Sequence, residues 1–139
     1  MENRYLNEDL RKQIREVFAD MVQPVRVVQH VCAYKDECET CQHTMSILKE
    51  LATLSDKLSL METDVHSPEA PEHSLQIQNA AEPVKSVGFW GMPVGHEFSI
   101  LVNDLLLVSR GESGLSEPVR NFLASLKTPV RLQVYVTPT

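Results

Sequence analysis

The hydrophobic positions along the chain change their period from segment to segment, and each period predicts one kind of element. Close to the N-terminus, apolar residues recur at the three- and four-residue spacing of an amphipathic helix. The residues of this stripe are Leu6, Leu10, Ile14, Val17, Phe18 and Met21. Asn7 is a suitable N-cap, and Pro24 marks the end of the segment. We therefore expect a first helix that packs on a sheet.

Segments that are rich in β-branched residues, or that alternate between apolar and polar ones, predict strands at residues 25–33, 58–63, 74–78 and 86–90. A helical stripe between the first two predicts a parallel pair joined by a right-handed crossover. The short connection between the last two predicts an antiparallel hairpin. The expected fold class is α/β, with a central mixed sheet and helices on both faces.

The C-terminal part repeats the helical pattern twice. A helix from about His96 has an apolar stripe of Phe98, Leu101, Val102, Leu105 and Leu106. The next helix has proline in its first turn, and its stripe is expected to face the core through Val119, Phe122, Leu123 and Leu126. The segment from Val130 to Val136 predicts a last strand.

Composition and charge narrow the function classes. With 139 residues and 42% apolar residues the chain can form one domain with a real core. A formal net charge of −6 and the lack of a Lys/Arg cluster argue against a nucleic-acid partner. We see no apolar run that could span a membrane and no signal-peptide core after Met1, so we expect a cytoplasmic protein without a membrane partner.

The strongest chemical motif is Cys38-Glu39-Thr40-Cys41, which lies between a strand and a helix. A cysteine at a helix N-terminus is favoured as the thiolate, because unpaired backbone N–H groups point at it. The second cysteine lies one turn later, where it can attack a mixed disulfide on the first. Three cysteines are too few for a disulfide scaffold, so we expect a redox-active pair with Cys38 as nucleophile and Cys41 as resolving thiol.

The main alternative for this motif is half of a zinc site or a pair of structural thiols. Tetrahedral zinc needs two further ligands. Cys32, His30 and His43 are near in sequence, but no second C-x-x-C or H-x-x-x-H pair follows. We expect Cys32 to be a small buried residue within the strand, His30 a satisfied core or edge residue, and His43 a solvated one, and we assign no metal and no cofactor.

Three further residues could be mistaken for site residues. His96 and Glu97 stand at a helix start, where capping and packing are the expected roles. Trp90 ends a strand and is expected in the core or at an interface.

The order of strands and helices around C-x-x-C is the thioredoxin arrangement, which predicts a cis-proline just before the third strand. Pro71 is the first candidate for that substrate-binding position, together with Glu39 and Thr40 beside the dithiol, and Pro68 is the second. An ordinary trans loop proline is the alternative.

Three stretches of the chain are specific enough to point to a family: Gly88-Phe89-Trp90-Gly91-Met92-Pro93-Val94-Gly95-His96-Glu97-Phe98, residues 54–59 and residues 130–139. Through them nearly the whole chain resembles the first unit of the glutaredoxin-like protein disulfide oxidoreductases. It is similar as well to the N-terminal domain of the alkyl hydroperoxide reductase flavoprotein subunit.

The resemblance implies a thioredoxin-like fold whose dithiol is Cys38 and Cys41, acting on protein disulfides in cell redox homeostasis and electron transport, with a flavoprotein reductase as a further candidate partner. In both families a segment like residues 130–139 leads into a second unit. We therefore expect a thioredoxin-fold unit over residues 1–127 and an extra strand within residues 128–139. An apolar strand without its own sheet invites pairing, so we expect a homodimer through Val130 to Val136.

Three functions thus compete. The first is thiol–disulfide exchange, in which Asp36, Glu37 and Glu39 oppose a thiolate on Cys38 and Lys35 alone offsets them. The second is a non-catalytic docking or dimerisation module with vestigial cysteines, and a zinc-binding domain comes third.

Overall fold

The computed structural model describes residues 5–137. Within this range the elements follow in the order α1 (Glu8–Phe18), β1 (Val25–His30), α2 (Glu39–Ala52), β2 (Leu58–Thr63), β3 (Ser74–Asn79), β4 (Ser86–Trp90), α3 (His96–Arg110) and α4 (Glu117–Ala124). None of these helices is long and apolar enough to cross a membrane.

The strands form one mixed sheet in the order β2-β1-β3-β4. β1 and β2 run parallel, from the pair Val25 and Leu58 to the pair His30 and Thr63. β3 lies antiparallel to both β1 and β4. The mixed sheet, the parallel crossover and the antiparallel hairpin are therefore confirmed, and with them the α/β class.

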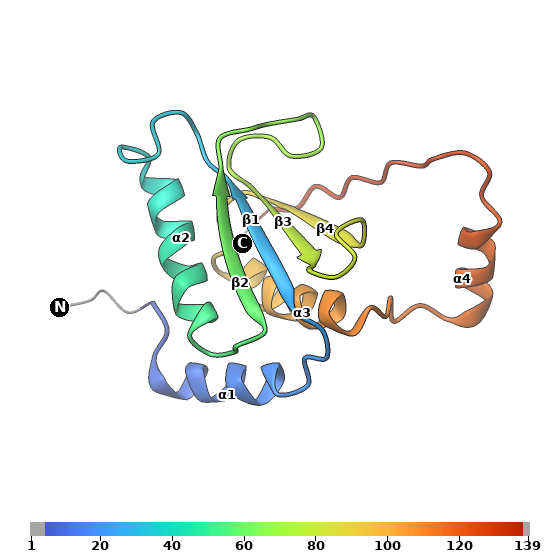
Figure 1. Cartoon of the computed structure of the whole chain (residues 1–139), viewed down its shortest axis with the longest axis horizontal. Coiled ribbons are helices and arrows are strands. Elements are labelled where there is room, and N and C mark those ends of the chain that lie inside the picture. Colours follow the sequence, from blue (N-terminus) through green and yellow to red (C-terminus); the bar gives the residue numbers. More distant parts are fainter. Residues whose placement is uncertain (1–4, 138–139) are drawn as a thin grey trace.

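One face of the sheet carries the core. Val25 and Val27 of β1 share this face with Leu75 and Ile77 of β3, because these residues are paired in register or lie two positions from a paired one. They pack in one buried cluster with the apolar stripes of α1, α2 and α3. Figure 1 shows these helices gathered around the sheet. We expected helices on both faces of the sheet. Within residues 5–137, the helices that pack on the sheet, α1, α2 and α3, join the core on one face.

The opposite face is covered at one end by the long loop between β2 and β3. His30 on this face contacts the carbonyl of Val65 through Nδ1 at 2.8 Å. Gln76 donates to the carbonyl of Glu69 at 3.2 Å. The loop therefore lies over the same end of the sheet as the start of α2.

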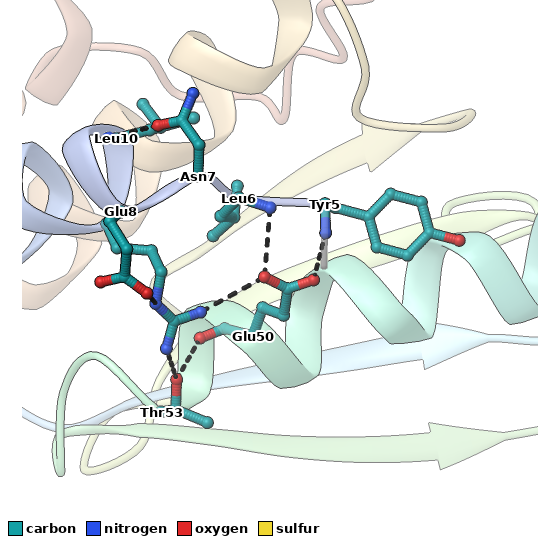
Figure 2. A network of polar contacts seen from close by, with 8 residues as sticks. Tyr5, Leu6, Asn7, Glu8, Leu10, Glu50 and Thr53 are labelled. Carbon is teal, nitrogen blue, oxygen red and sulfur yellow. Dashed lines mark hydrogen bonds and ion pairs between the residues drawn. The ribbon is translucent and has the colours of Figure 1, made fainter. Parts of the chain in front are cut away.

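A carboxylate on α2 holds the N-terminal segment in place (Figure 2). Glu50 accepts hydrogen bonds from the backbone N–H groups of Tyr5 at 2.5 Å and Leu6 at 3.1 Å. Arg11 of α1 donates to the same carboxylate at 3.3 Å and to the Thr53 hydroxyl at 3.1 Å. These contacts join α1 to α2 and fix the helix that carries the dithiol.

The chain beyond α3 differs from expectation. α4 has no buried residue, and Phe122 is 65% exposed, so its predicted role in the core is wrong. Figure 1 shows α4 standing apart from the sheet. The predicted strand from Val130 to Val136 is also wrong, because these residues are irregular and exposed. Arg131 ties this segment back, because it donates to the carbonyl of Pro68 at 2.9 Å and pairs with Glu69 at 3.6 Å.

Candidate redox site

The dithiol lies at the N-terminus of α2. Cys38 is the N-cap, and its Sγ accepts a hydrogen bond from the backbone N–H of Cys41 at 3.3 Å. Cys38 is half-buried, whereas Cys41 is only 3% exposed. The buried Gln29 of β1 donates to the carbonyl of Cys41 at 2.9 Å and so fixes the helix start against the sheet. The sequence did not single out Gln29, because an amide in a strand has no motif.

The two thiols differ in acidity. The pKa of Cys38 is lowered from its ordinary value, first by a hydrogen bond from the Cys41 side chain and then by backbone N–H groups of the helix start. Burial raises the pKa of Cys41 to about 12, with the hydrogen bond to Cys38 adding to the effect. An accessible acidic thiol above a buried protonated one is the arrangement expected of a nucleophile and a resolving thiol.

His73 is a third member of the site that the sequence analysis missed. Its Nδ1 lies 3.6 Å from Sγ of Cys41 and 3.9 Å from Sγ of Cys38. The sheet brings it there, because His30 at the end of β1 pairs with Ser74 at the start of β3. His73 also donates its backbone N–H to the carbonyl of His30 at 2.9 Å and has a φ of 61°.

Cys32 belongs to the same site, which corrects the expectation of an inert residue within the strand. β1 ends at His30, so Cys32 lies in the loop that follows. It is half-buried, and its Sγ lies 3.7 Å from Sγ of Cys41.

Pro71 does not take the predicted position. No peptide bond within residues 5–137 is cis. The residue directly before β3 is His73, and Pro71 lies two positions earlier, where its carbonyl accepts a hydrogen bond from the Ser74 hydroxyl at 2.6 Å. His73, and not a proline, therefore lies beside the dithiol at the start of this strand.

The remaining predicted residues surround the dithiol without converging on it. Glu39 is exposed and Thr40 half-buried in the first turn of α2. Lys35 does not offset the acids as expected, because its ammonium is paired with Glu62 at 2.6 Å. A cleft of about 220 Å³ opens beside Cys41, lined by Val31, Lys35, Asp36, Gln42, Met45, Ser46, Lys49 and Glu62.

The residues set aside by the sequence analysis lie outside this site. His30 is buried and satisfied by Val65, as expected. His43 is half-buried, and its ring meets the ring of Tyr5 edge-on at 5.8 Å. Trp90 is 46% exposed at the end of the edge strand β4. Glu97 lies in the first turn of α3, and no side chain caps that helix.

Comparison with known proteins gives two kinds of relative. The alkyl hydroperoxide reductase protein AhpF of Pseudomonas aeruginosa is 27% identical over 130 residues, and its counterpart in Xanthomonas campestris pv. phaseoli is 28% identical over 121. The match spans 94% and 84% of this chain. By sequence, then, the chain resembles part of this reductase. No family model matches it.

Solved structures extend the likeness to the fold. The NTD_N/C domain of AhpF from Enterococcus faecalis matches with a TM-score of 0.71 at 26% identity, over 86% of this chain and 61% of that one. A protein disulfide oxidoreductase from Aeropyrum pernix K1 matches with a TM-score of 0.68 at 28% identity, over 87% and 55%. The expected resemblance to both kinds of protein is confirmed, and the fold is thioredoxin-like.

The shared region is a small part of the sequence relatives. This chain spans 23% of the Pseudomonas protein and 21% of the Xanthomonas one. What those proteins do as a whole is therefore carried to this chain only as a proposal.

Proposed function

We propose that this chain is a thiol–disulfide oxidoreductase in which Cys38 attacks a protein disulfide and Cys41 resolves the product. The observation that supports this most is the pairing of a half-buried Cys38 at a helix N-terminus with a buried Cys41 one turn later. The lowered pKa of Cys38 and the raised pKa of Cys41 agree with these roles.

In the first step the Cys38 thiolate attacks one sulfur of the substrate disulfide. A bond forms between Cys38 and that sulfur, and the other substrate sulfur leaves as a thiolate. The backbone N–H of Cys41, 3.3 Å from Sγ of Cys38, stabilises the thiolate before attack.

In the second step Cys41 must lose its proton before it can attack Cys38. Because its pKa is raised to about 12, it needs a base within reach. We assign that role to His73, whose Nδ1 lies 3.6 Å from Sγ of Cys41. The proton passes to His73. The Cys41 thiolate then forms a disulfide bond with Cys38, and the second substrate sulfur leaves as a thiolate. The dithiol has then given two electrons to the substrate and holds a disulfide.

The substrate in this proposal is an exposed protein disulfide. The cleft beside Cys41 offers a place for a chain segment that flanks the disulfide. Glu39 and Thr40 in the first turn of α2, and Pro71 two positions before His73, are the residues that we propose contact that segment. A reducing cytoplasm, where thiols stay reduced, suits the cycle. The cycle also needs a reductant, for which we retain a flavoprotein reductase as the proposed partner.

Insulin-disulfide reduction with dithiothreitol tests the proposal. We expect the wild type to accelerate precipitation of the insulin chains, and Cys38→Ser to show only the background rate. Val84→Ser is the control, because Val84 is 89% exposed in the turn between β3 and β4, outside the site. Equal rates for wild type and Cys38→Ser would contradict the proposal.

A second role, dimerisation, is favoured by the exposed apolar side chains of α4 and the following segment. Val119 is 42% exposed and Phe122 65%, and the residues from Val130 to Val136 include more of the same kind. We propose that a second copy of the chain covers them. Light scattering should give a dimer for wild type and a monomer for Phe122→Ser, with exposed Val84→Ser as control. A monomeric wild type would contradict this role.

A further inference from the structure

We propose that the reduced site binds one zinc ion through Cys32, Cys38, Cys41 and His73. The sulfurs of Cys32 and Cys38 and one ring nitrogen of His73 all lie within 4.8 Å of one another. Cys41 lies against this group, 3.7 Å from Cys32 and 3.6 Å from His73. Three sulfurs and one imidazole are a common donor set for tetrahedral zinc.

The spacing of these atoms fits the metal. Zinc bonds of about 2.3 Å to sulfur and 2.0–2.1 Å to nitrogen require tetrahedral ligands about 3.8 Å apart for two sulfurs and about 3.6 Å apart for sulfur and nitrogen. The sulfurs of Cys32 and Cys41 are 3.7 Å apart. Nδ1 of His73 is 3.6 Å from Cys41 and 3.9 Å from Cys38. These three separations need changes of a few tenths of an ångström at most. The distances from Cys32 to Cys38 and to His73, each within 4.8 Å, would shorten by up to about 1.2 Å on binding.

The proposed site joins residues that are far apart in the sequence. The ligands come from the loop after β1, the start of α2 and the residue before β3, so three separate segments meet at one point. His73 is exposed and could have pointed into solvent. Its φ of 61° is unusual for a residue other than glycine, and here it accompanies a ring beside two sulfurs.

The local charge also favours a cation. The site is flanked in sequence by the exposed carboxylates of Asp36, Glu37 and Glu39. These charges oppose a bare thiolate but attract a divalent ion. On binding, three thiols release three protons and the imidazole binds as the neutral ring, so the zinc and its ligands carry one negative charge. The N–H of Cys41 already donates to Cys38 and would support that thiolate.

Zinc binding and disulfide exchange would exclude one another. When a disulfide substrate oxidises Cys38 and Cys41, it takes two electrons and leaves as two thiolates. Two of the zinc ligands then form a disulfide, which no longer binds the ion. Zinc is then released. This exclusion rests on the proposed function, whereas the zinc site itself does not.

Metal titration of the reduced 139-residue chain tests the site. Zinc alone is added under anaerobic conditions with a phosphine reductant and a competing chromophoric chelator. We expect one zinc per chain, and an affinity at least about tenfold weaker in Cys32→Ser and in His73→Gln. His66→Gln is the matched control, because His66 lies in the same loop and its ring contacts the carbonyl of Val31 at 2.7 Å. It should bind like wild type.

Cobalt provides a spectroscopic readout of the ligand set, and its first comparison uses the wild type alone. Wild type with Co²⁺ should show thiolate charge-transfer bands and the ligand-field bands of a tetrahedral ion, and Cys32→Ser should lose part of the charge-transfer intensity. The proposal is overturned if wild type fails to hold zinc against the chelator, or if Cys32→Ser and His73→Gln bind as tightly as wild type. Zinc binding without insulin reduction would support the zinc site and contradict the proposed function. Insulin reduction without zinc binding would support the proposed function and contradict the zinc site.

Discussion

Removal of the Glu50 carboxylate should destabilise the fold without changing the redox site. Glu50 accepts three hydrogen bonds, from the backbone of Tyr5 and Leu6 and from Arg11 (Figure 2). The side chains of Glu50 and Arg11 are only 16% and 13% exposed. Glu50→Ala leaves two backbone donors and one guanidinium without this acceptor.

The expected magnitude follows from these three bonds. Charge-assisted bonds are worth about 1.5–3 kcal/mol when buried, and partial exposure reduces this to about 1 kcal/mol each. Glu50→Ala should therefore lose about 3 kcal/mol of unfolding free energy, which lowers Tm by about 10 °C in a chain of this size. Urea and thermal denaturation followed by circular dichroism measure both quantities.

The control is Glu8→Ala, which removes a second acid near Arg11. The Glu8 side chain is 70% exposed and 3.9 Å from the guanidinium, so its loss should cost under about 1 kcal/mol. Alkylation of Cys38 should be unchanged in both folded variants, because Glu50 lies in the second half of α2, away from Cys38. If Glu50→Ala were no less stable than Glu8→Ala, the reasoning would be refuted.

Two further predictions concern titrating groups. In Cys41→Ala the pKa of Cys38 should rise, because the hydrogen bond from the Cys41 side chain is the largest cause of its lowering. The pH profile of Cys38 alkylation by iodoacetamide, measured with a chelator present, should therefore shift to higher pH. An unshifted profile would contradict this. Burial raises the pKa of Asp104, because the charged carboxylate is less well solvated in the folded chain. The protonated form therefore favours folding at low pH, and this contribution to the free energy of unfolding is lost as pH rises through the folded-state pKa. Asp104→Asn should then be more stable than wild type at pH 7 and lose that advantage at acidic pH. Urea denaturation at both pH values measures this, and a less stable variant at pH 7 would refute it.

Local patterns predicted most of the fold. β2 and β4 have the bounds that alternation predicted, and Asn7 caps α1 by accepting from the N–H of Leu10 at 2.8 Å. β1 is shorter than predicted, because its apolar run continues past the last paired residue, His30. α4 has the predicted helical pattern, but periodicity identifies an apolar face and not what covers it.

The site was only partly predictable for a different reason. Cys38 and Cys41 are close in sequence, so their spacing reveals them. His73 follows a long loop, and only the register of β3 against β1 places it beside the sulfurs. Cys32 was misjudged because the end of β1 decides whether its side chain lies in the sheet or in the loop at the dithiol. Pro71 was misjudged although the start of β3 was predicted correctly, because the thioredoxin arrangement expects a proline directly before that strand and this chain has His73 there.

The most direct test of the central claim is to trap the mixed disulfide. The Cys41→Ser and Cys38→Ser variants of the 139-residue chain are each incubated with a disulfide-bonded protein substrate and analysed by non-reducing mass spectrometry. We predict that Cys41→Ser accumulates an adduct joined through Cys38, because the accessible thiolate attacks and the proposed resolving thiol is absent. Cys38→Ser should form none. An adduct of equal yield in Cys38→Ser, or none in Cys41→Ser, would contradict the account.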